Sequence, residues 1–440
     1  MATKVTLIFD IGKTNKKLFL FDKDNKEVYR EYQRFEEIPD EDGFLSEDLP
    51  ILVNWIKERA EFIVSNPDYD VTGINFSTYG ASMVHLDKEG NVIAPFYNYL
   101  KTFPEDLKQE FFKKHGSEEN FAVTTGSPSS GFLNVGLQLI YLKYRKPHLF
   151  EKLDKSLYFP QFLSSIFTGE YVSDYTYVGC HTGMWNFKNM DYAQWVKDED
   201  LVRFLTPIVP TTKQYQAKIK GKTVNVGVGV HDSSSAFIPF SNEAKNPFTL
   251  ISTGTWSVCM NSFNQNPLTK SEAEKDCLHF LSIEGTSIKA SRLLLGKELS
   301  EQIRKIAAAF ECDYQIYKTV VYDRKFKPLS SDEKELLFNY KHLEPERFSF
   351  VQPEATSYEK FTGFEHAYHQ LIHELTRIQI ASLNLVIGDS GVKDLYVDGG
   401  FVDNELFISM LEESLPEYNI YPTDSPLGSA LGATLLLDLG

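Results

Sequence analysis

Two short turns in the sequence combine glycine with hydroxyl, amide and lysine side chains, residue types that can bind phosphate. One turn follows the apolar run VTLIFDI, and the other follows FTLIS in the second half of the chain. Their residues are Gly12, Lys13, Thr14, Asn15 and Lys17 in the first turn, and Thr253, Gly254 and Thr255 in the second. Phosphate binds where backbone N–H groups converge and no Cβ blocks its approach. Each turn alone is also typical of a plain hairpin, but the pair predicts a nucleotide held from two sides.

Two aspartates follow apolar runs. Asp10 ends the first run, where it can cap the turn or serve a Mg²⁺ ion, since hard cations prefer carboxylate and water oxygens. Asp232 follows VNVGVGVH and opens the small-residue stretch DSSSA. It can cap a helix, or it can accept the proton of a hydroxyl that attacks a γ-phosphate. An ordinary aspartate is ionised at neutral pH, which suits a base. His231 is better explained as a packed histidine.

A glycine pair followed by an asparagine marks a third place for a ligand. Gly399 and Gly400 end the predicted strand DLYVD, and Asn404 precedes a predicted helix. Because glycine has no Cβ, a flat ring can lie against this backbone, and Asn404 can hydrogen-bond to it. The alternative is a tight strand-to-helix turn.

Apolar strands and amphipathic helices must position these residues. The apolar runs predict strands over 5–11 and 17–22, with a third near 27–33. Apolar residues at helical spacing predict helices over 47–65 and, most clearly, over 364–387.

The second half of the chain repeats the architecture of the first. After the surface stretch PFSNEAKNP, residues 248–261 again read as strand, turn and strand. A chain of 440 residues is also too long for one ordinary core. We therefore predict an α/β protein with two duplicated domains, 1–240 and 241–440, around a cleft. The run SALGA near the C terminus predicts a helix that packs closely near the site.

The composition argues against several classes of partner. A net charge of −16 disfavours nucleic acid and anionic membranes, both of which require a basic face. No apolar run approaches the roughly 20 residues of a membrane span. The four cysteines have no disulfide or metal-site spacing, and the N terminus does not resemble a signal peptide. We expect a cytoplasmic protein with small-molecule partners, and a homodimer is compatible with the sequence.

Five motifs, in their order and spacing, resemble the FGGY carbohydrate kinases of the actin and hexokinase superfamily. They are DIGKTNKK (10–17), GVGVHDSSSA (227–236), STGTWS (252–257), DGGFVDN (398–404) and SPLGSALGATLLL (425–437). Within the family, the motifs look most like those of L-rhamnulokinase and L-fuculokinase. The resemblance implies two ribonuclease-H-like (actin-like ATPase) domains, with ATP, Mg²⁺ and sugar in the interdomain cleft.

The resemblance also assigns roles to the matching residues. It implies that Asp10 organises Mg²⁺ and its waters and that Asp232 is the catalytic base. It implies that the two turns and Lys17 bind the ATP phosphates. The residues that it places at the adenosine site are Gly399, Gly400 and Asn404.

The sugar side departs from the family pattern. STYGAS (77–82) has Ala81 where a rhamnulokinase-like sequence has aspartate, and YNYLK (97–101) stands in place of Tyr-Arg-Asp-x-Arg. Two charges close to the sugar are therefore absent. The residues expected to contact the sugar are Tyr79, Gly80, Ala81 and Asp232.

The leading hypothesis is an ATP-dependent kinase for a ketose such as L-rhamnulose or L-fuculose. One alternative is a kinase of the same family for a pentulose or polyol, such as xylulose, ribulose or glycerol. Another is a non-catalytic actin-like ATPase or sugar-binding regulator. Asp232 favours a kinase, because a regulator has little need of a carboxylate in the cleft.

Overall fold

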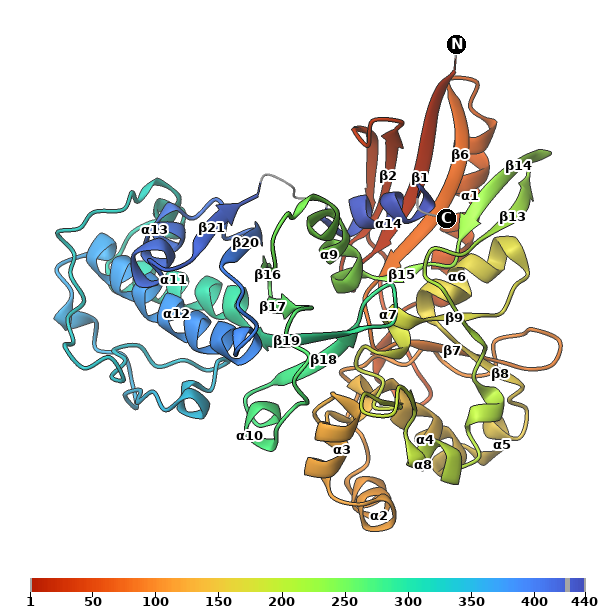
Figure 1. Cartoon of the computed structure of the whole chain (residues 1–440), viewed down its shortest axis with the longest axis horizontal. Helices are drawn as coiled ribbons and strands as arrows, with labels where there is room; N and C mark the ends of the chain where they lie inside the picture. Colours follow the sequence, from red (N-terminus) through yellow and green to blue (C-terminus); the bar gives the residue numbers. More distant parts are fainter. Residues whose placement is uncertain (1, 424–427, 439–440) are drawn as a thin grey trace.

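The computed structural model describes residues 2–423 and 428–438, and each half of the chain is built around one mixed sheet (Figure 1). The first sheet has the strand order β13-β14-β6-β1-β2-β3, with β15 also paired to β6. Its central strand β1 is antiparallel to β2 and parallel to β6. The strands are β1 (Thr3–Ile11), β2 (Lys16–Asp22), β3 (Glu27–Gln33), β6 (Tyr69–Thr78), β13 (Gln214–Ile219), β14 (Lys222–Gly227) and β15 (Val230–His231).

The second sheet repeats this arrangement around β16. Its order is β18-β19-β17-β16-β20-β21, and β16 is antiparallel to β17 and parallel to β20. The expected duplication of an α/β unit is therefore confirmed. The strands are β16 (Phe248–Thr253), β17 (Ser257–Asn261), β18 (Cys277–Leu281), β19 (Ser287–Leu293), β20 (Asp394–Gly399) and β21 (Asn419–Pro422).

The candidate turns lie at equivalent edges of the two sheets. In the first sheet the carboxyl ends of β1 and β6 meet, with Ile11 opposite Thr78. In the second, the carboxyl ends of β16 and β20 meet, with Thr253 opposite Gly399. Ligands of α/β proteins bind beyond such carboxyl edges, because the loops that leave parallel strands converge there.

The predicted long helices are present. Helix α1 (Leu49–Ser65) begins after Asp48, whose side chain accepts a hydrogen bond from the backbone of Ile51. Helix α12 (Phe364–Ile387) lies against β17 and β19, and α11 (Leu295–Ala309) and α13 (Glu405–Ser414) pack on it. No helix within residues 2–423 and 428–438 has both the length and the apolar character needed to cross a membrane.

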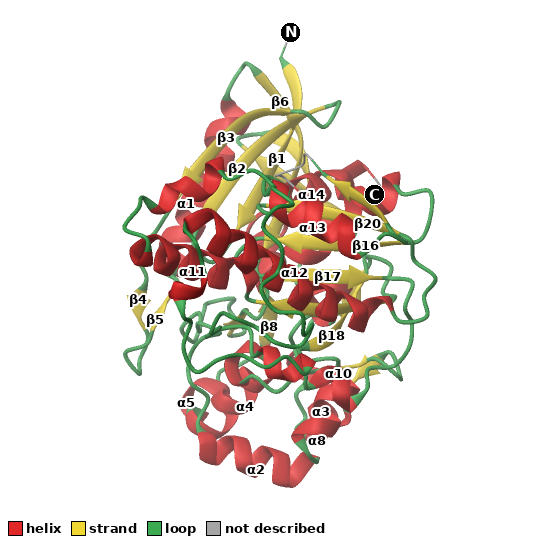
Figure 2. Cartoon of the chain, turned by 90° about the vertical axis from the view of Figure 1, so that its left-hand side faces the viewer, coloured by secondary structure: helices red, strands yellow, loops and turns green. Residues whose placement is uncertain are grey.

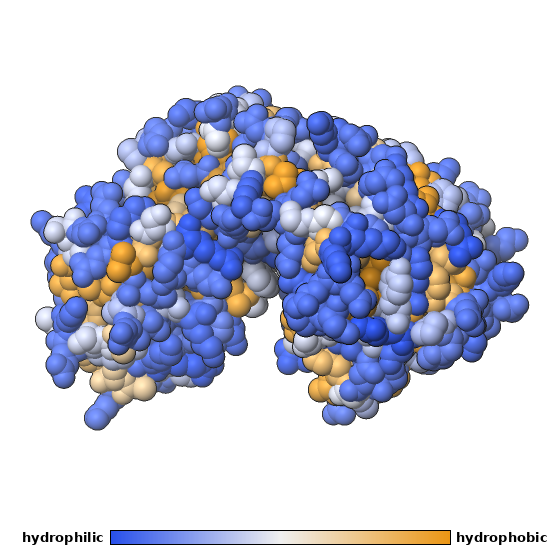
Figure 3. Space-filling view, turned by 90° about the horizontal axis from the view of Figure 1, so that it is seen from below, coloured by the Kyte–Doolittle hydropathy of each residue, from blue (hydrophilic) through white to orange (hydrophobic). Residues whose placement is uncertain are grey.

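Short helices gather at the end of the N-terminal half that lies away from the tips of β1 and β2 (Figure 2). They are α2 (Glu105–His115), α3 (Glu118–Thr125), α4 (Val135–Arg145), α5 (Pro147–Phe150) and α8 (Gln194–Asp198). The two halves form two lobes with a cleft between them (Figure 3).

Two helices of small residues cross between the sheets, α9 (Asp232–Glu243) and α14 (Gly428–Asp438) (Figure 1). A Cβ on Gly432 would lie 1.9 Å from the carbonyl oxygen of Ser235, so the crossing requires glycine. The close packing expected of the SALGA run is thus confirmed. Helix α14 also lies against β1 and β6, so this late segment returns to the N-terminal half. Ser425, Pro426 and Leu427 of the same motif lie outside the described residues.

Candidate active site

Asp10 lies at the carboxyl end of β1 and is buried. Its Oδ2 atom is 3.3 Å from Nζ of Lys17, which stands opposite it on β2, and its Oδ1 atom accepts a 3.1 Å hydrogen bond from the Ser429 hydroxyl on α14. Burial raises the pKa of Asp10; the charge of Lys17 opposes this rise, and the negative charge of Asp232 adds to it. Asp10 and Asp232 therefore lie within electrostatic range of each other.

Asp232 is the first residue of α9. Its Oδ1 atom accepts hydrogen bonds from the backbone N–H of Ser233 at 2.6 Å and from the Ser233 hydroxyl at 3.2 Å. The side chain is 35% exposed, and the rest of its surface is covered by protein atoms. This burial raises the pKa of Asp232 from 3.8 to about 6, against the opposing effects of Ser233 and Lys17. Such a carboxylate is mostly ionised at pH 7 and can still accept a proton.

His231 packs behind Asp232. Its Nε2 atom is 3.3 Å from Oδ1 of Asp232 and 3.3 Å from Sγ of Cys180. Burial lowers the pKa of His231 to about 3, so the ring is neutral near pH 7. Within the described part of the chain, no group hydrogen-bonds to its Nδ1 atom. The neutral ring therefore packs against the Asp232 carboxyl without adding a positive charge beside it.

Asp232 lines a cavity of about 610 Å³ to which both halves contribute, called here the interdomain cavity. Tyr79, Gly80 and Ala81 line the same cavity, so the residues expected to contact the sugar are brought together with Asp232. The residues that the C-terminal half contributes are Trp256, Val258, Phe280 and Arg292.

The lysines and the arginine of this cavity are each paired with carboxylates. The pairs are Lys101 with Asp40 and Asp42 (2.6 and 2.7 Å), Lys108 with Glu118 (2.9 Å), and Arg292 with Asp276 (2.7 Å). Burial also lowers the pKa of His181, which keeps its ring neutral. As far as the described residues show, the interdomain cavity therefore offers no uncompensated positive charge.

Gly80 and Ala81 shape the cavity through their backbone. A Cβ on Gly80 would lie 2.8 Å from Nε2 of His231, so a larger residue would push the histidine away from Asp232. Ala81 is buried and has a left-handed backbone, with φ of 59°. Gly80 and Ala81 thus give the cavity space and backbone groups, whereas a rhamnulokinase-like sequence has an aspartate in place of Ala81.

The first turn lies outside this cavity, and its side chains bind neighbouring loops. The N–H of Gly12 donates to the carbonyl of Asn15 at 3.0 Å, which closes the turn. Thr14 is exposed. The side-chain contacts are Lys13 with Glu37, and Asn15 Oδ1 with Nε of Arg34 at 2.7 Å.

Lys16 supports the first turn from below. Its Nζ atom donates to the carbonyl oxygens of Gly12 and Lys13 at 3.2 and 3.0 Å and pairs with Glu47 at 2.7 Å. Both charged side chains of this pair are at most 4% exposed. Lys16 thus holds the turn in shape, and its charge is already paired.

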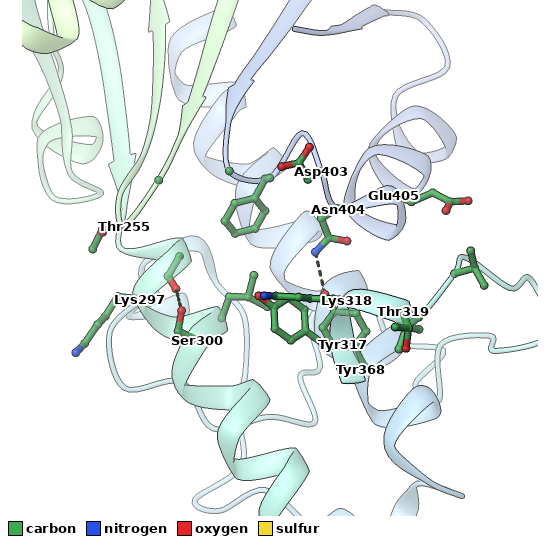
Figure 4. A pocket seen from close by; sticks show the side chains of 17 residues that line it. Thr255, Lys297, Ser300, Tyr317, Lys318, Thr319, Tyr368, Asp403, Asn404 and Glu405 are labelled. Atoms are coloured by element: carbon green, nitrogen blue, oxygen red, sulfur yellow. Dashed lines mark hydrogen bonds between the residues drawn. The ribbon is translucent and has the colours of Figure 1, made fainter. Parts of the chain in front are cut away.

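A second cavity, of about 740 Å³, lies within the C-terminal half and is called here the C-terminal cavity (Figure 4). Gly254, Thr255, Gly400 and Asn404 line it, so four residues expected to bind the nucleotide come together. Asn404 donates from Nδ2 to the hydroxyl of Tyr368 at 3.0 Å. Its Oδ1 accepts from the backbone of α13, so the Asn404 amide already has protein partners at both ends.

Thr253 and Gly399 hold the ends of β16 and β20 together next to this cavity. The Thr253 hydroxyl donates to the carbonyl of Asp398 at 2.6 Å and accepts from the N–H of Phe401 at 3.0 Å. Gly399 has φ of 88°, and a Cβ there would lie 1.8 Å from the Thr253 carbonyl oxygen. Glycine is therefore required for the two strand ends to meet.

Several residues of both cavities were not predicted as site residues from the sequence. In the interdomain cavity they include His181, Trp256, Phe280 and Arg292. In the C-terminal cavity they include Lys297, Tyr317, Lys318 and Tyr368 (Figure 4). The strand-like run SIKASRL, which becomes β19, indicates a strand at Arg292 but not that this side chain enters the cavity.

Two proteins of known activity resemble parts of this chain. A rhamnulokinase of Bacteroides thetaiotaomicron is 28% identical over 256 residues, which cover 55% of this chain and 51% of the relative. An L-fuculokinase of Escherichia coli strain K12 is 24% identical over 200 residues, which cover 43% of this chain and 41% of the relative. The matches thus span about half the length of these relatives, or less.

The whole fold resembles that of a solved carbohydrate kinase from Novosphingobium aromaticivorans. The TM-score is 0.78 at 22% identity, and the match covers 100% of this chain and 92% of the other. At this identity the likeness establishes the fold alone, and it confirms the expected pair of actin-like ATPase domains.

Two family models match consecutive parts of the chain. Residues 5–238 match the N-terminal domain of the FGGY family of carbohydrate kinases, and residues 245–322 match a C-terminal domain of carbohydrate kinase FGGY. The first match alone includes more than half of the chain. The chain therefore belongs to the FGGY family of carbohydrate kinases.

Proposed function

We propose that this protein is a kinase that transfers the γ-phosphate of ATP to a hydroxyl of a neutral ketose, with L-rhamnulose and L-fuculose as the first candidates. The observation that carries the proposal is the position of Asp232. It lines a cavity built by both halves, lies within electrostatic range of Asp10 and Lys17, and has a pKa of about 6. Relatives named rhamnulokinase and L-fuculokinase support this choice of sugars.

Asp232 acts as the general base of the transfer. It accepts the proton of the ketose hydroxyl while the hydroxyl oxygen bonds to the γ-phosphorus. The bond from this phosphorus to the bridging oxygen breaks, and ADP leaves with the bonding electrons. The neutral ring of His231 packs beside the carboxyl of this base, 3.3 Å from its Oδ1 atom.

The nucleotide binds in the C-terminal cavity. Gly400 and the backbone around Gly254 and Thr255 admit flat and anionic groups, because they add little side-chain bulk. The first turn and Lys17 bind the outer phosphates when the two lobes approach each other, a movement that also excludes water.

Asp10 is the residue of this chain that suits Mg²⁺. The ion uses one or two carboxylates together with water and phosphate oxygens. Asp10 is a buried carboxylate near the carboxyl end of β1, beside the first turn, and no cluster of three or more metal-binding side chains occurs within the described residues. This set fits an ion that is held largely by the nucleotide. When bound, Mg²⁺ supplies neutralisation of phosphate charge.

The charges of the interdomain cavity favour a neutral sugar over a sugar acid. Its three cationic side chains already have carboxylate partners, so a substrate carboxylate would enter without a free counter-ion. Phe103, Leu133 and Phe280 also line the cavity and can accept the methyl group of a 6-deoxy ketose.

Purified protein should be assayed for ADP release with L-rhamnulose, L-fuculose, D-xylulose, D-ribulose, glycerol and D-gluconate. We expect a 6-deoxy ketose to give the highest kcat/KM and gluconate to give little or no turnover. Asp232→Asn should lower kcat by about 10²- to 10⁴-fold without loss of ATP binding. Asp394→Asn is the matched control. Asp394 is also a buried carboxylate, but it lies at the start of β20, at the opposite end of this strand from Gly399. Turnover of Asp232→Asn at the rate of the wild type would remove the base assignment.

A further inference from the structure

Trp256 differs from the other tryptophans of this chain because it is exposed. The chain has four tryptophans, and Trp256 is 44% exposed, whereas Trp55, Trp185 and Trp195 are 8, 5 and 6% exposed. Trp256 lies in the turn between β16 and β17 and lines the interdomain cavity. Its neighbour Thr255 lines the C-terminal cavity. One short turn therefore contributes to both cavities.

Arg292 supports the indole of Trp256. The guanidinium carbon lies 5.3 Å from the centre of the indole ring system, within the range of a cation–π contact. Arg292 in turn donates to both carboxylate oxygens of Asp276, from Nε at 2.7 Å and from Nη2 at 3.1 Å. The pairing of β17 with β19 sets this arrangement, because it places Arg292 opposite Val258. The indole is thus held by a contact that the sheet itself defines.

Aromatic side chains of the N-terminal half line the same cavity. Tyr79 and Tyr99 both line it, and their ring centres are 6.1 Å apart. The positive charge of Arg292 lowers the pKa of Tyr99, although burial raises it more, so the two groups lie near each other across the cleft. A ligand in this cavity therefore meets aromatic rings from both halves.

We propose that Trp256 is a sugar-contacting side chain contributed by the C-terminal half and that its indole stacks on the C–H face of the ketose. The inference rests on the function proposed above. Ketose C–H groups carry small positive partial charges that suit the electron-rich face of an indole, and the hydroxyls stay free for polar contacts. Arg292 and Asp276 are positioning residues for the indole. Because their charges cancel, this side of the cavity favours a neutral sugar ring over a charged one.

Kinetics of three variants test the contact. Trp256→Leu should raise the KM of the ketose by about tenfold, which is the loss of one good stacking contact. The KM of ATP should change less than about twofold, because the turn backbone is unaltered. Trp256→Phe keeps an aromatic face and should recover most of the ketose affinity. Phe263→Leu is the matched control, since Phe263 is 42% exposed just beyond the other end of β17 and lines neither cavity.

Tryptophan fluorescence tests the same contact without catalysis. Ketose alone should change the emission of the wild type but not that of Trp256→Phe, because the other three tryptophans are buried. Suppose that the wild type forms ADP with a ketose, while Trp256→Leu keeps the wild-type KM and Trp256→Phe keeps the fluorescence response. The inference about Trp256 then fails and the kinase proposal stands. A fluorescence response without ADP formation supports the contact and refutes the kinase, and the absence of both refutes both.

Discussion

Acidification should inactivate the proposed base at a pH where an ordinary aspartate is still ionised. The pKa of Asp232 is about 6 because partial burial of the carboxyl at the start of α9 disfavours its charged form. About nine tenths of the Asp232 carboxylates are then ionised at pH 7 and about one tenth at pH 5. We therefore expect kcat/KM for the ketose to fall about tenfold between pH 7 and pH 5. An aspartate with a pKa of 3.8 would lose less than about a tenth of its ionised form over this range.

The assay must separate this titration from that of the nucleotide. ADP formation is measured directly at limiting ketose and saturating ATP and Mg²⁺, so that kcat/KM for the ketose reports the base before sugar binds. The residual activity of Asp232→Asn, measured over the same pH range, shows any pH dependence that comes from ATP rather than from Asp232. Lys17→Met offers a second comparison, because the charge of Lys17 lowers the pKa of Asp232. Without this charge, the fall in kcat/KM should occur at a higher pH.

Two results would refute the reasoning. One is a wild-type kcat/KM that falls only near pH 4, which would show that the pKa of Asp232 is not raised or that its ionisation does not limit the rate. The other is a residual activity of Asp232→Asn that also falls near pH 6, which would assign the titration to another group.

Three further predictions concern the supports of the site. Lys16→Met should lower the free energy of unfolding by about 3 to 5 kcal/mol in urea titrations, because it leaves Glu47 buried without its partner; a change below about 1 kcal/mol contradicts this. Asp10→Asn should raise the Mg²⁺ concentration for half-maximal rate more than the ketose KM, and equal changes in both would argue against a metal role. Gly399→Ala should raise the KM of ATP by about tenfold or more, since its Cβ would displace the Thr253 carbonyl; an unchanged KM would show that this strand end does not shape the nucleotide site.

Local patterns were sufficient to predict the elements that local contacts define. The strands expected over 5–11 and 17–22 correspond to β1 and β2, and the helix expected over 364–387 has the same bounds as α12. Both glycine turns lie where predicted, because an apolar strand on each side leaves only the turn exposed. The sequence thus indicated both carboxyl edges at which the cavities form.

Contacts between distant strands were not predictable in the same way. Arg292 reaches the interdomain cavity because β19 pairs with β17 on one side and with β18 on the other. No residue near Arg292 along the chain reveals this pairing. The sequence therefore predicted that two charges close to the sugar are absent, but not that Arg292 enters the cavity already paired with Asp276.

The helix crossing at the centre of the molecule explains how residues so distant in sequence meet. Asp232 begins α9, and α9 leads into β16, whose far end carries the turn shared by both cavities. Because Gly432 has no Cβ, α14 can approach α9 closely, and Ser429 on α14 then contacts Asp10 at the end of β1. The base and Asp10 are therefore held within one packed unit. The nucleotide cavity belongs to the other sheet, so the lobes can approach each other without moving the base away from Asp10.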